Sequence, residues 1–300
     1  MPLRSVILLC AMPLLLLSCG EQQTTTDNTD KVKDTTITIH SKTQERPTLT
    51  YHAISVKDSA FAQLKATLDS NQMQIIYAIN RVDKKHISKL DTIIVPDKMA
   101  ELMQYSPYPT SLPFLKDVNK IIFFSYPAEA FGAYEHGNLV LWGPTNMGRK
   151  KDPTPTGLTY ANWKKEVDTS SVKDEWILKW NVNVLNKDGV GFHEYDLPGY
   201  PASHSCLRLQ DSDAHFLYKW TDQWILMGAD SIVAHGTPIM IFGVYPFGSR
   251  RPWRALLQNP KAMDITPETL EQLIQPVLQT IITEQQKLSN SLATKQTAKK

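Results

Sequence analysis

The most informative part of this chain is residues 191–209, which have the sequence GFHEYDLPGYPASHSCLRL. This segment holds one thiol, Cys206, and two imidazoles, His193 and His204. A cysteine becomes a nucleophile as its thiolate, which requires a nearby base or positive charge. His193 ends a predicted strand thirteen positions before Cys206, and the Pro- and Gly-containing loop between them can fold back onto that strand. The segment therefore predicts a cysteine nucleophile served by a histidine base.

The sequence around this segment predicts a body built mainly of β-strands. Its apolar runs are short, and turns with Gly and Asn, which adopt positive φ easily, separate several of them. The expected strands are 121–124, 130–134, 139–142, 176–184, 190–194 and 238–242. A helix is predicted over 211–224, with Phe216, Leu217, Trp220 and Trp224 in the core. We expect a mainly β catalytic domain over residues 119–246, an antiparallel sandwich or a partly closed barrel.

Helical patterns flank this body on both sides. Residues 53–98 contain three short helical patterns followed by an apolar strand, an order that weakly resembles a lysin motif, a small peptidoglycan-binding module. The alternative for this segment is a helical cap packed on the main domain. Residues 247–300 form a C-terminal helical extension, in which apolar residues recur at helical spacing and Pro276 predicts a kink.

The start of the chain has the pattern of a secretory signal. In residues 1–18 one charged residue, Arg4, precedes a twelve-residue apolar stretch, which is shorter than the roughly 20 residues needed to span a bilayer. The sequence LLSC at 16–19 resembles the bacterial lipobox, which implies cleavage before Cys19 and lipidation of that residue. Residues 19–52 are poor in apolar side chains and are expected to form a flexible tether to the lipid.

Composition excludes two other classes of protein. The chain has 32 Lys and Arg against 30 Asp and Glu, and its longest basic run is Arg149-Lys150-Lys151. A nucleic-acid binder is expected to show a clustered basic face instead. Because 7 Trp, 11 Tyr and 9 Phe can form a core, an intrinsically disordered chain is excluded as well.

Four elements together resemble the L,D-transpeptidase catalytic family. The family signature is Ser or Thr, His, Gly, Cys, an apolar residue and then Arg or Asn, and Ser203–Arg208 matches it except at Ser205, where Gly is usual. The upstream family histidine is matched by His193, followed by Glu194 where Gly is usual. The other two matches are Thr154-Pro155-Thr156-Gly157 and Gly236-Thr237-Pro238-Ile239-Met240-Ile241.

The resemblance implies an envelope enzyme that acts on peptidoglycan stem peptides. Cys206 is the expected nucleophile and His193 its base, and Ser203, His204 and Ser205 support the loop and the oxyanion. Arg208 either pairs with a substrate carboxylate or braces the loop. The thioacyl intermediate formed with loss of D-Ala passes to an amine, giving a 3→3 cross-link or similar product. No metal or organic cofactor and no nucleic acid is expected, and the lipid anchor places the domain at a membrane of the bacterial envelope, facing the periplasm.

Other interpretations of the same residues stay open. One is a carboxypeptidase or endopeptidase that transfers the acyl group to water, and another is a non-catalytic wall-binding lipoprotein with an inert buried Cys206. A zinc site is a third, since His and Cys are common zinc ligands. Its ligands would be His193, His204, Cys206 and His215, although their spacing lacks a close pair such as Cys-x-x-Cys. The acceptor of the acyl group and the oligomeric state are not determined by the sequence.

Overall fold

The computed structural model describes residues 49–169, 177–228 and 231–297. These residues belong to one compact unit that spans Arg46–Lys300. The predicted signal peptide, the lipidated Cys19 and the predicted tether up to residue 48 lie outside the described residues. In the described part of the chain, no helix has the length and apolar character needed to cross a membrane.

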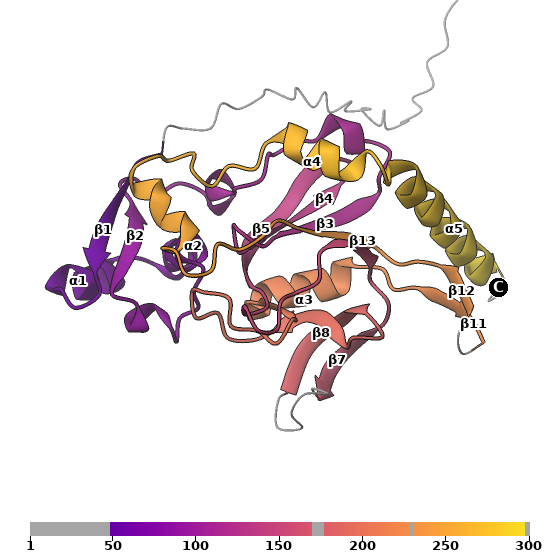
Figure 1. Ribbon diagram of the computed structural model, residues 1–300, viewed down its shortest axis with the longest axis horizontal. Coiled ribbons are helices and arrows are strands. Elements are labelled where there is room, and N and C mark those ends of the chain that lie inside the picture. The colour runs from indigo at the N-terminus through magenta and orange to yellow at the C-terminus, as the bar shows by residue number, and fades with distance from the viewer. Residues whose placement is uncertain (1–48, 170–176, 229–230, 298–300) are drawn as a thin grey trace, which may run out of the picture. The chain divides into compact units, whose positions relative to one another are not determined.

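A nine-stranded sheet forms the centre of the molecule (Figure 1). In order across the sheet, the strands are β6 (Gly157–Tyr160), β13 (Pro238–Phe242), β3 (Lys120–Ser125), β4 (Ala130–Glu135), β5 (Asn138–Asn146), β10 (Leu207–Leu209), β9 (Val190–Glu194), β8 (Ile177–Leu185) and β7 (Lys164–Thr169). All neighbours are antiparallel except the pairs β13 with β3 and β10 with β9. The prediction of a mainly β domain is confirmed, with these two parallel pairs as an addition.

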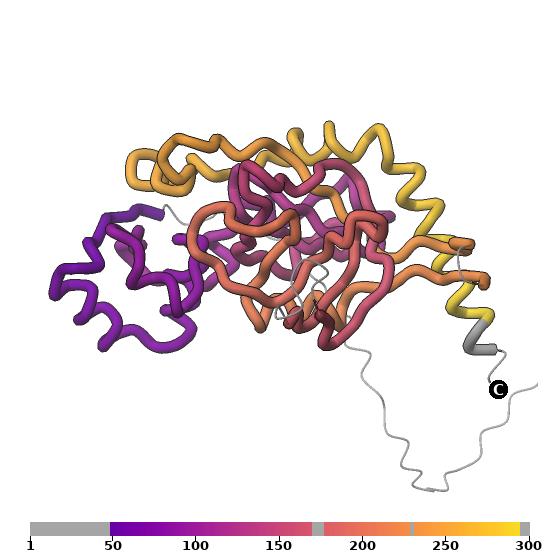
Figure 2. Tube along the Cα trace, turned by 60° about the horizontal axis from the view of Figure 1, so that its bottom comes forward, coloured from indigo at the N-terminus to yellow at the C-terminus, as the bar shows by residue number. Residues whose placement is uncertain are grey.

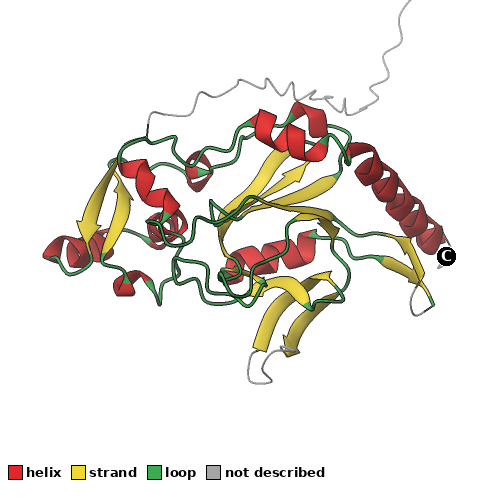
Figure 3. Cartoon of the chain, viewed as in Figure 1, coloured by secondary structure: helices red, strands yellow, loops and turns green. Residues whose placement is uncertain are grey.

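The sheet curls, so that its first strand, β6, contacts β8 near the other edge of the sheet. In Figure 3 the yellow strands of the sheet lie on two sides of a helix. The chain leaving β6 pairs with β8: Asn162 N–H donates to Asn183 O at 2.8 Å, and Asn183 N–H donates to Trp163 O at 2.9 Å. The Thr159 hydroxyl also donates to the carbonyl of Val184. The same chain then continues as β7, still alongside β8. The expected partly closed barrel is therefore the observed architecture.

Strand composition explains the sheet. β3 has the sequence KIIFFS, and its four apolar side chains are fully buried because the strand lies in the middle of the sheet and is covered on both faces. The hairpin of β4 and β5 turns at His136 and Gly137, whose φ values are 46° and 75°. Positive φ at both central residues is what a tight two-residue hairpin requires.

The N-terminal segment consists of two helices and a two-stranded sheet. Its elements are β1 (Tyr51–Ser55), α1 (Ser59–Thr67), α2 (Ser70–Asn80), a 3₁₀ turn (Ile87–Lys89) and β2 (Thr92–Pro96), with β1 and β2 antiparallel. α2 begins with a capping box in which Asp69 and Gln72 bond each other's backbone N–H groups. The helices and β2 fall where the sequence predicts them, whereas β1 is not predicted because its exposed, partly polar sequence lacks a strand pattern. The likeness of this segment to a lysin motif stays a prediction.

The remaining elements follow β10. They are α3 (Asp211–Trp220), β11 (Ile225–Met227), β12 (Ser231–Ala234), α4 (Pro267–Ile274) and α5 (Leu278–Thr297). α3 ends at Trp220 instead of 224, and the placement of Phe216 in the core is wrong: its side chain is 40% exposed and stacks on Trp220. The predicted break at Pro276 is confirmed, since α4 and α5 are separate helices. α5 lies along β12, at the yellow end of the tube in Figure 2.

Candidate active site

Cys206 lies directly before β10, and His193 lies on the neighbouring strand β9. β10 and β9 are parallel, with Leu207 opposite Phe192 and Arg208 opposite His193. Leu207 and Phe192 are fully buried in the core. Side chains alternate between the faces of a strand, so Cys206, His193 and Arg208 share the other face. The catalytic pairing of this cysteine with this histidine stays a prediction.

His193 is held as a neutral imidazole. Its side chain is buried, and its Nδ1 donates a hydrogen bond to the Glu194 carbonyl at 2.8 Å. Because a carbonyl accepts only, Nδ1 carries the proton and Nε2 is the basic nitrogen. Burial, with a smaller contribution from the charge of Arg208, lowers the pKa of His193 to about 4 although the hydrogen bond to the Glu194 carbonyl raises it. The imidazole is therefore uncharged at neutral pH.

Cys206 is a partly exposed thiol, not a preformed thiolate. Burial raises its pKa, while the Gly191 backbone N–H and the Arg208 charge oppose that shift. The hydrogen bond that Sγ makes is a long one, 4.0 Å to the carbonyl of Gly189. Among the described contacts, none joins Sγ to the His193 ring. The thiol and the imidazole are therefore both uncharged at neutral pH.

Residues 197–205, the segment directly before Cys206, form the Cys206 loop. The chain after β5 fixes it: Ser203 N–H donates to Met147 O at 3.1 Å, and Arg149 N–H donates to Ser203 O at 2.9 Å. The Thr154 hydroxyl donates to Ser205 O at 2.8 Å and accepts from Gly148 N–H at the same distance. Thr154 opens the Thr-Pro-Thr-Gly element found in the sequence, and its role here is to hold this loop.

Ser205 adopts a conformation that favours glycine. Its φ is 79°, in the left-handed region, at the position where the family signature has Gly. Its hydroxyl donates to the Asp152 carbonyl at 3.3 Å. The departure from the signature therefore leaves the turn in place and adds backbone strain of about 1–2 kcal/mol.

His204 belongs to an ion-pair cluster at the edge of the Cys206 loop. Its Nδ1 lies 3.3 Å from Arg149 Nη2 and 3.6 Å from Asp152, and Arg149 pairs with Asp152 at 2.6 Å. These contacts fit the predicted supporting role. Ser203, also predicted as support, is buried with its hydroxyl unpaired among the described residues.

Arg208 packs over an aromatic ring. Its guanidinium carbon lies 4.5 Å from the centre of the Tyr195 ring, and burial lowers its pKa. This placement favours bracing of the site, and its charge also acts on both Cys206 and His193. Pairing with a substrate carboxylate stays a prediction.

A buried polar network below the Cys206 loop is absent from the sequence-based prediction. Glu129 accepts hydrogen bonds from Met147 N–H at 3.0 Å and from the Asn146 amide at 3.2 Å. Asn146 in turn accepts from Ala202 N–H at 3.2 Å and donates to the Tyr200 carbonyl. Burial raises the pKa of Glu129 to about 8 although the charge of Arg81 lowers it. The network fixes the middle of the loop.

The N-terminal segment reaches the same loop. Arg81, at the end of α2, is buried between Trp142 and Trp253 and donates to the Ala128 carbonyl at 2.7 Å. Asp83 accepts from Leu197 N–H at 2.7 Å. A charged residue directly after the apolar helix sequence IIYAIN was the available signal for Arg81, but no sequence feature marks its partners.

The zinc alternative has no support in the described residues. The group of three or more metal-ligating side chains found there is Asp83, His86 and Asp196, which contains none of the four proposed ligands. Asp83 is already bonded to His86 and Leu197, and Asp196 pairs with Lys85 at 3.2 Å. His215 instead packs on Trp180, with ring centres 4.2 Å apart.

Comparison with known proteins gives one family and several solved structures. The model of the L,D-transpeptidase catalytic domain (YkuD) matches residues 119–252. An L,D-transpeptidase from Stackebrandtia nassauensis is similar at 20% identity and TM-score 0.35, over 43% of this chain and 57% of that one. An L,D-transpeptidase from Mycobacterium smegmatis is similar at 21% identity and TM-score 0.34, over 42% of this chain and 59% of that one.

The chain thus spans less than two thirds of these two structures. A third, L,D-transpeptidase 1 of Mycobacterium tuberculosis, is 20% identical with TM-score 0.32, over 42% of this chain and 62% of that one. No curated protein matches the chain. The family match contains the cysteine, the histidine and the sheet that pairs them, and residues 119–252 therefore form a domain of the L,D-transpeptidase catalytic family.

Proposed function

We propose that this protein is a peptidoglycan L,D-transpeptidase with Cys206 as its nucleophile. The observation that carries the proposal is the placement of Cys206 beside a neutral, tautomer-fixed His193 on adjoining parallel strands of the matched domain. A protonated thiol next to a neutral imidazole is the starting state for general-base activation of a nucleophile.

In the acylation step, Sγ attacks the carbonyl carbon of the third residue of a tetrapeptide stem while the thiol proton passes to His193 Nε2. The oxyanion that forms is assigned to the backbone N–H groups of residues 204–206; loss of one such donor typically costs ~10²–10³ in rate. When the intermediate collapses, the C–N bond to D-Ala breaks and His193 returns the proton to the leaving amine. The product is a thioester on Cys206.

In the second step an amine of a neighbouring stem attacks the thioester carbon and gives its proton to His193. The C–S bond breaks, and the thiolate of Cys206 recovers the proton. If water takes the place of the amine, the product is a trimmed stem and the enzyme is a carboxypeptidase. The chemistry needs the same residues in both cases.

The cellular setting is part of the proposal. The Arg4 start, the short apolar stretch and the LLSC sequence support export and lipidation at Cys19, which would hold the domain in the bacterial envelope, facing the periplasm. Expression with labelled palmitate tests this point. Label that is incorporated by the native chain and lost in Cys19→Ala supports the anchor, and label retained in Cys19→Ala contradicts it.

Disaccharide-tetrapeptide incubated with the purified full chain and followed by mass spectrometry tests the reaction. A product heavier by one stem, with D-Ala released and all activity lost in Cys206→Ala, supports a transpeptidase. D-Ala release without a cross-linked product supports the carboxypeptidase. Retained D-Ala release in Cys206→Ala overturns the mechanism, and no turnover with several stems favours a wall-binding protein.

A further inference from the structure

Residues 81–86, called the α2 turn because they directly follow α2, lie outside the domain that matches the family. They run alongside the start of the Cys206 loop. Val82 and Pro198 form an antiparallel bridge, and Asp83 N–H donates to Leu197 O at 3.0 Å. The Leu197 N–H in turn donates to Asp83 Oδ2 at 2.7 Å. The first residue of the loop therefore has both of its backbone polar groups bonded to Asp83.

The carboxylate of Asp83 is itself held in place by the α2 turn. His86 N–H donates to Asp83 Oδ1 at 2.9 Å, and His86 Nδ1 lies 2.8 Å from the same oxygen. The Asp83 side chain is only 18% exposed. A backbone N–H bonded to an ionised acceptor makes a stronger hydrogen bond than one bonded to a neutral group. Asp83 thus holds Leu197 with an acceptor that is oriented before the loop meets it.

The α2 turn and the Cys206 loop also pack closely. Gly199 has a φ of 82°, and a Cβ built on it would lie 2.8 Å from Val82 Cγ1. Such a contact is shorter than real Cβ atoms make, and the positive φ favours glycine as well. There is no space between the two segments, so a displacement of the α2 turn displaces the loop.

The same turn supports a second anchor of the loop. The Arg81 Nε donates to the Ala128 carbonyl at 2.7 Å, and Ala128 directly precedes Glu129. Glu129 accepts from the Asn146 amide at 3.2 Å, and Asn146 accepts from Ala202 N–H at 3.2 Å. Through Asp83 the α2 turn holds the start of the loop, and through Arg81 it supports the residues that hold the middle.

We propose that Asp83 is a positioning residue for the reaction at Cys206, so that the catalytic unit includes the N-terminal segment. Leu197 lies on the stretch of chain that joins His193 to Cys206, and holding it restricts how far the imidazole and the thiol can move relative to each other. A displacement of about 1 Å caused by a mutation outside the reacting groups can lower a rate ~10²-fold. The proposal rests on the proposed function, because the rate that it explains is that of D-Ala release.

The test is Asp83→Ala in the full chain, with D-Ala release measured over a range of disaccharide-tetrapeptide concentrations. We expect kcat to fall by about 10–100-fold. KM should stay close to that of the parent, because Asp83 bonds the loop backbone and has no described contact with the thiol. Only protein with a native circular dichroism spectrum is compared.

Hydrogen exchange of the same variant measures the loop without any turnover. Mass spectrometry of overlapping peptides that contain Leu197 follows its amide. Loss of the bond to Asp83 is expected to speed exchange of this amide about tenfold or more.

The matched control is Asp69→Ala in the same segment. Asp69 Oδ1 also accepts a backbone N–H, that of Gln72 at 2.8 Å, but it caps the start of α2 and has no described contact with the Cys206 loop. The variant is expected to lower the free energy of unfolding while kcat and Leu197 exchange stay as in the parent. An equal loss of kcat in Asp69→Ala would show that Asp83→Ala acts through the stability of the whole segment, which overturns the positioning role.

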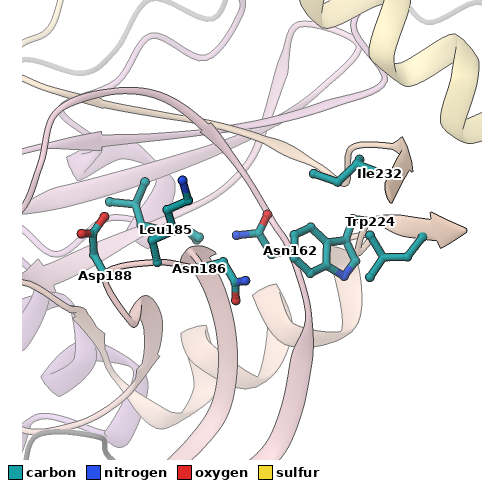
Figure 4. Close-up of a pocket in the computed structure, with 9 residues that line it drawn as sticks. Asn162, Leu185, Asn186, Asp188, Trp224 and Ile232 are labelled. Atoms are coloured by element: carbon teal, nitrogen blue, oxygen red, sulfur yellow. The ribbon is translucent and has the colours of Figure 1, made fainter. Parts of the chain in front are cut away.

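A second control lies in another part of the molecule. A cavity of about 460 Å³ opens between the β8–β9 turn and the β11–β12 hairpin, with Asn162, Trp224 and Ile232 in its wall (Figure 4). Among the described residues, its lining includes neither the α2 turn nor the Cys206 loop. Ile232→Ala changes this wall and is expected to leave both kcat and Leu197 exchange unchanged.

Asp83→Asn keeps the test decisive if Asp83→Ala does not fold. Its side chain has one acceptor oxygen for the two N–H groups of Leu197 and His86, so kcat should fall by less than in the alanine variant and Leu197 exchange should still rise. Parent-like kcat and parent-like exchange in folded Asp83→Asn and Asp83→Ala overturn the positioning role and leave the proposed function intact. Faster Leu197 exchange in a protein whose parent releases no D-Ala supports the contact with the loop and overturns the proposed function.

Discussion

The two flanks of Cys206 are built differently. On the β5 flank, the Cys206 loop is fixed by backbone bonds of Ser203, by the hydroxyl of Thr154 and by the amide of Asn146. On the β8–β9 flank, the described contacts of the thiol are the 4.0 Å bond to the Gly189 carbonyl and the backbone N–H of Gly191. The β5 flank is therefore fixed by several hydrogen bonds within the protein, and the β8–β9 flank makes fewer described contacts near the thiol.

The difference separates two tasks of a covalent enzyme. The backbone that receives the oxyanion must be fixed before the substrate arrives, because donors that reorganise during the reaction stabilise the transition state less. The side that receives a second substrate must instead stay accessible until acylation is complete. Under the proposed function, the first task falls to the β5 flank, whose backbone is fixed by these hydrogen bonds.

Removal of the base is expected to have the largest effect. His193→Gln should lower D-Ala release by ~10²–10⁴, the range for loss of a general base. His193 bonds the adjacent Glu194 carbonyl and no part of the Cys206 loop, so the β5 flank should keep its structure. Stopped assays of D-Ala release give the rate, and iodoacetamide labelling above the pKa of the thiol should match the parent. A rate within tenfold of the parent would contradict the role of His193.

The pH profile is expected to show the next largest effect. Since burial lowers the pKa of His193 to about 4, the imidazole stays neutral and basic down to that pH. The acid limb of kcat/KM should therefore have its midpoint near 4. A histidine of ordinary pKa ≈ 6.5 would lose roughly thirtyfold at pH 5. The profile of D-Ala release between pH 4 and 9 measures this.

Circular dichroism controls for acid unfolding in that experiment. The unfolded chain takes up a proton on His193 at a higher pH than the folded chain does. The free energy of unfolding is therefore expected to decrease as the pH is lowered from about 6.5 to 4. Rates of D-Ala release are compared only at pH values where the circular dichroism spectrum is that of the folded protein. An acid limb centred near 6.5 in folded protein would show that His193 is not the neutral buried base described here.

Loss of one hydroxyl should loosen the β5 flank. Thr154→Val keeps the shape but leaves Ser205 O and Gly148 N–H without their partner. An unsatisfied buried polar group costs about 1–3 kcal/mol, and about 1.4 kcal/mol corresponds to tenfold in rate. We expect D-Ala release about tenfold slower, with acceptor KM unchanged. The control is Thr283→Val, which removes a hydroxyl bonded to Gln279 O on α5 and should leave the rate unchanged.

The sequence predicts the parts of this fold that local pattern determines. Apolar runs and turn residues locate β3, the β4–β5 and β8–β9 hairpins and β13, because each carries its own signal. β7 has the sequence KKEVDT, with a single apolar residue, and β10 has the sequence LRL, which is too short for its alternation to mark a strand. Both become strands through their neighbours in the curled sheet, which a single segment does not encode.

The residues of the candidate site also divide into those that the sequence predicts and those that it does not. Cys206, His193 and the Thr154 element are found because they lie in short motifs that chemistry explains. Glu129 and Asn146 lie outside any motif, and their contacts with residues 200–202 depend on how β4 and β5 meet the loop. The sequence marks Ser205 only as a departure from the usual glycine, and its φ of 79° shows that this turn has the left-handed conformation.

The strain at Ser205 gives the smallest expected effect. Ser205→Gly should raise the free energy of unfolding by about 1 kcal/mol, because glycine adopts positive φ without the steric cost that serine has there. The hydroxyl bond that is lost, 3.3 Å to Asp152 O, is long and weak. Ser205→Ala keeps the strain and removes the same bond, so it isolates the backbone contribution in denaturant unfolding. D-Ala release should stay within about twofold of the parent, since Thr154 still holds the Ser205 carbonyl. A glycine variant less stable than the alanine variant would mean that the strained conformation is maintained by contacts of the serine side chain, and the β5 flank would then depend on Ser205 as well as on Thr154.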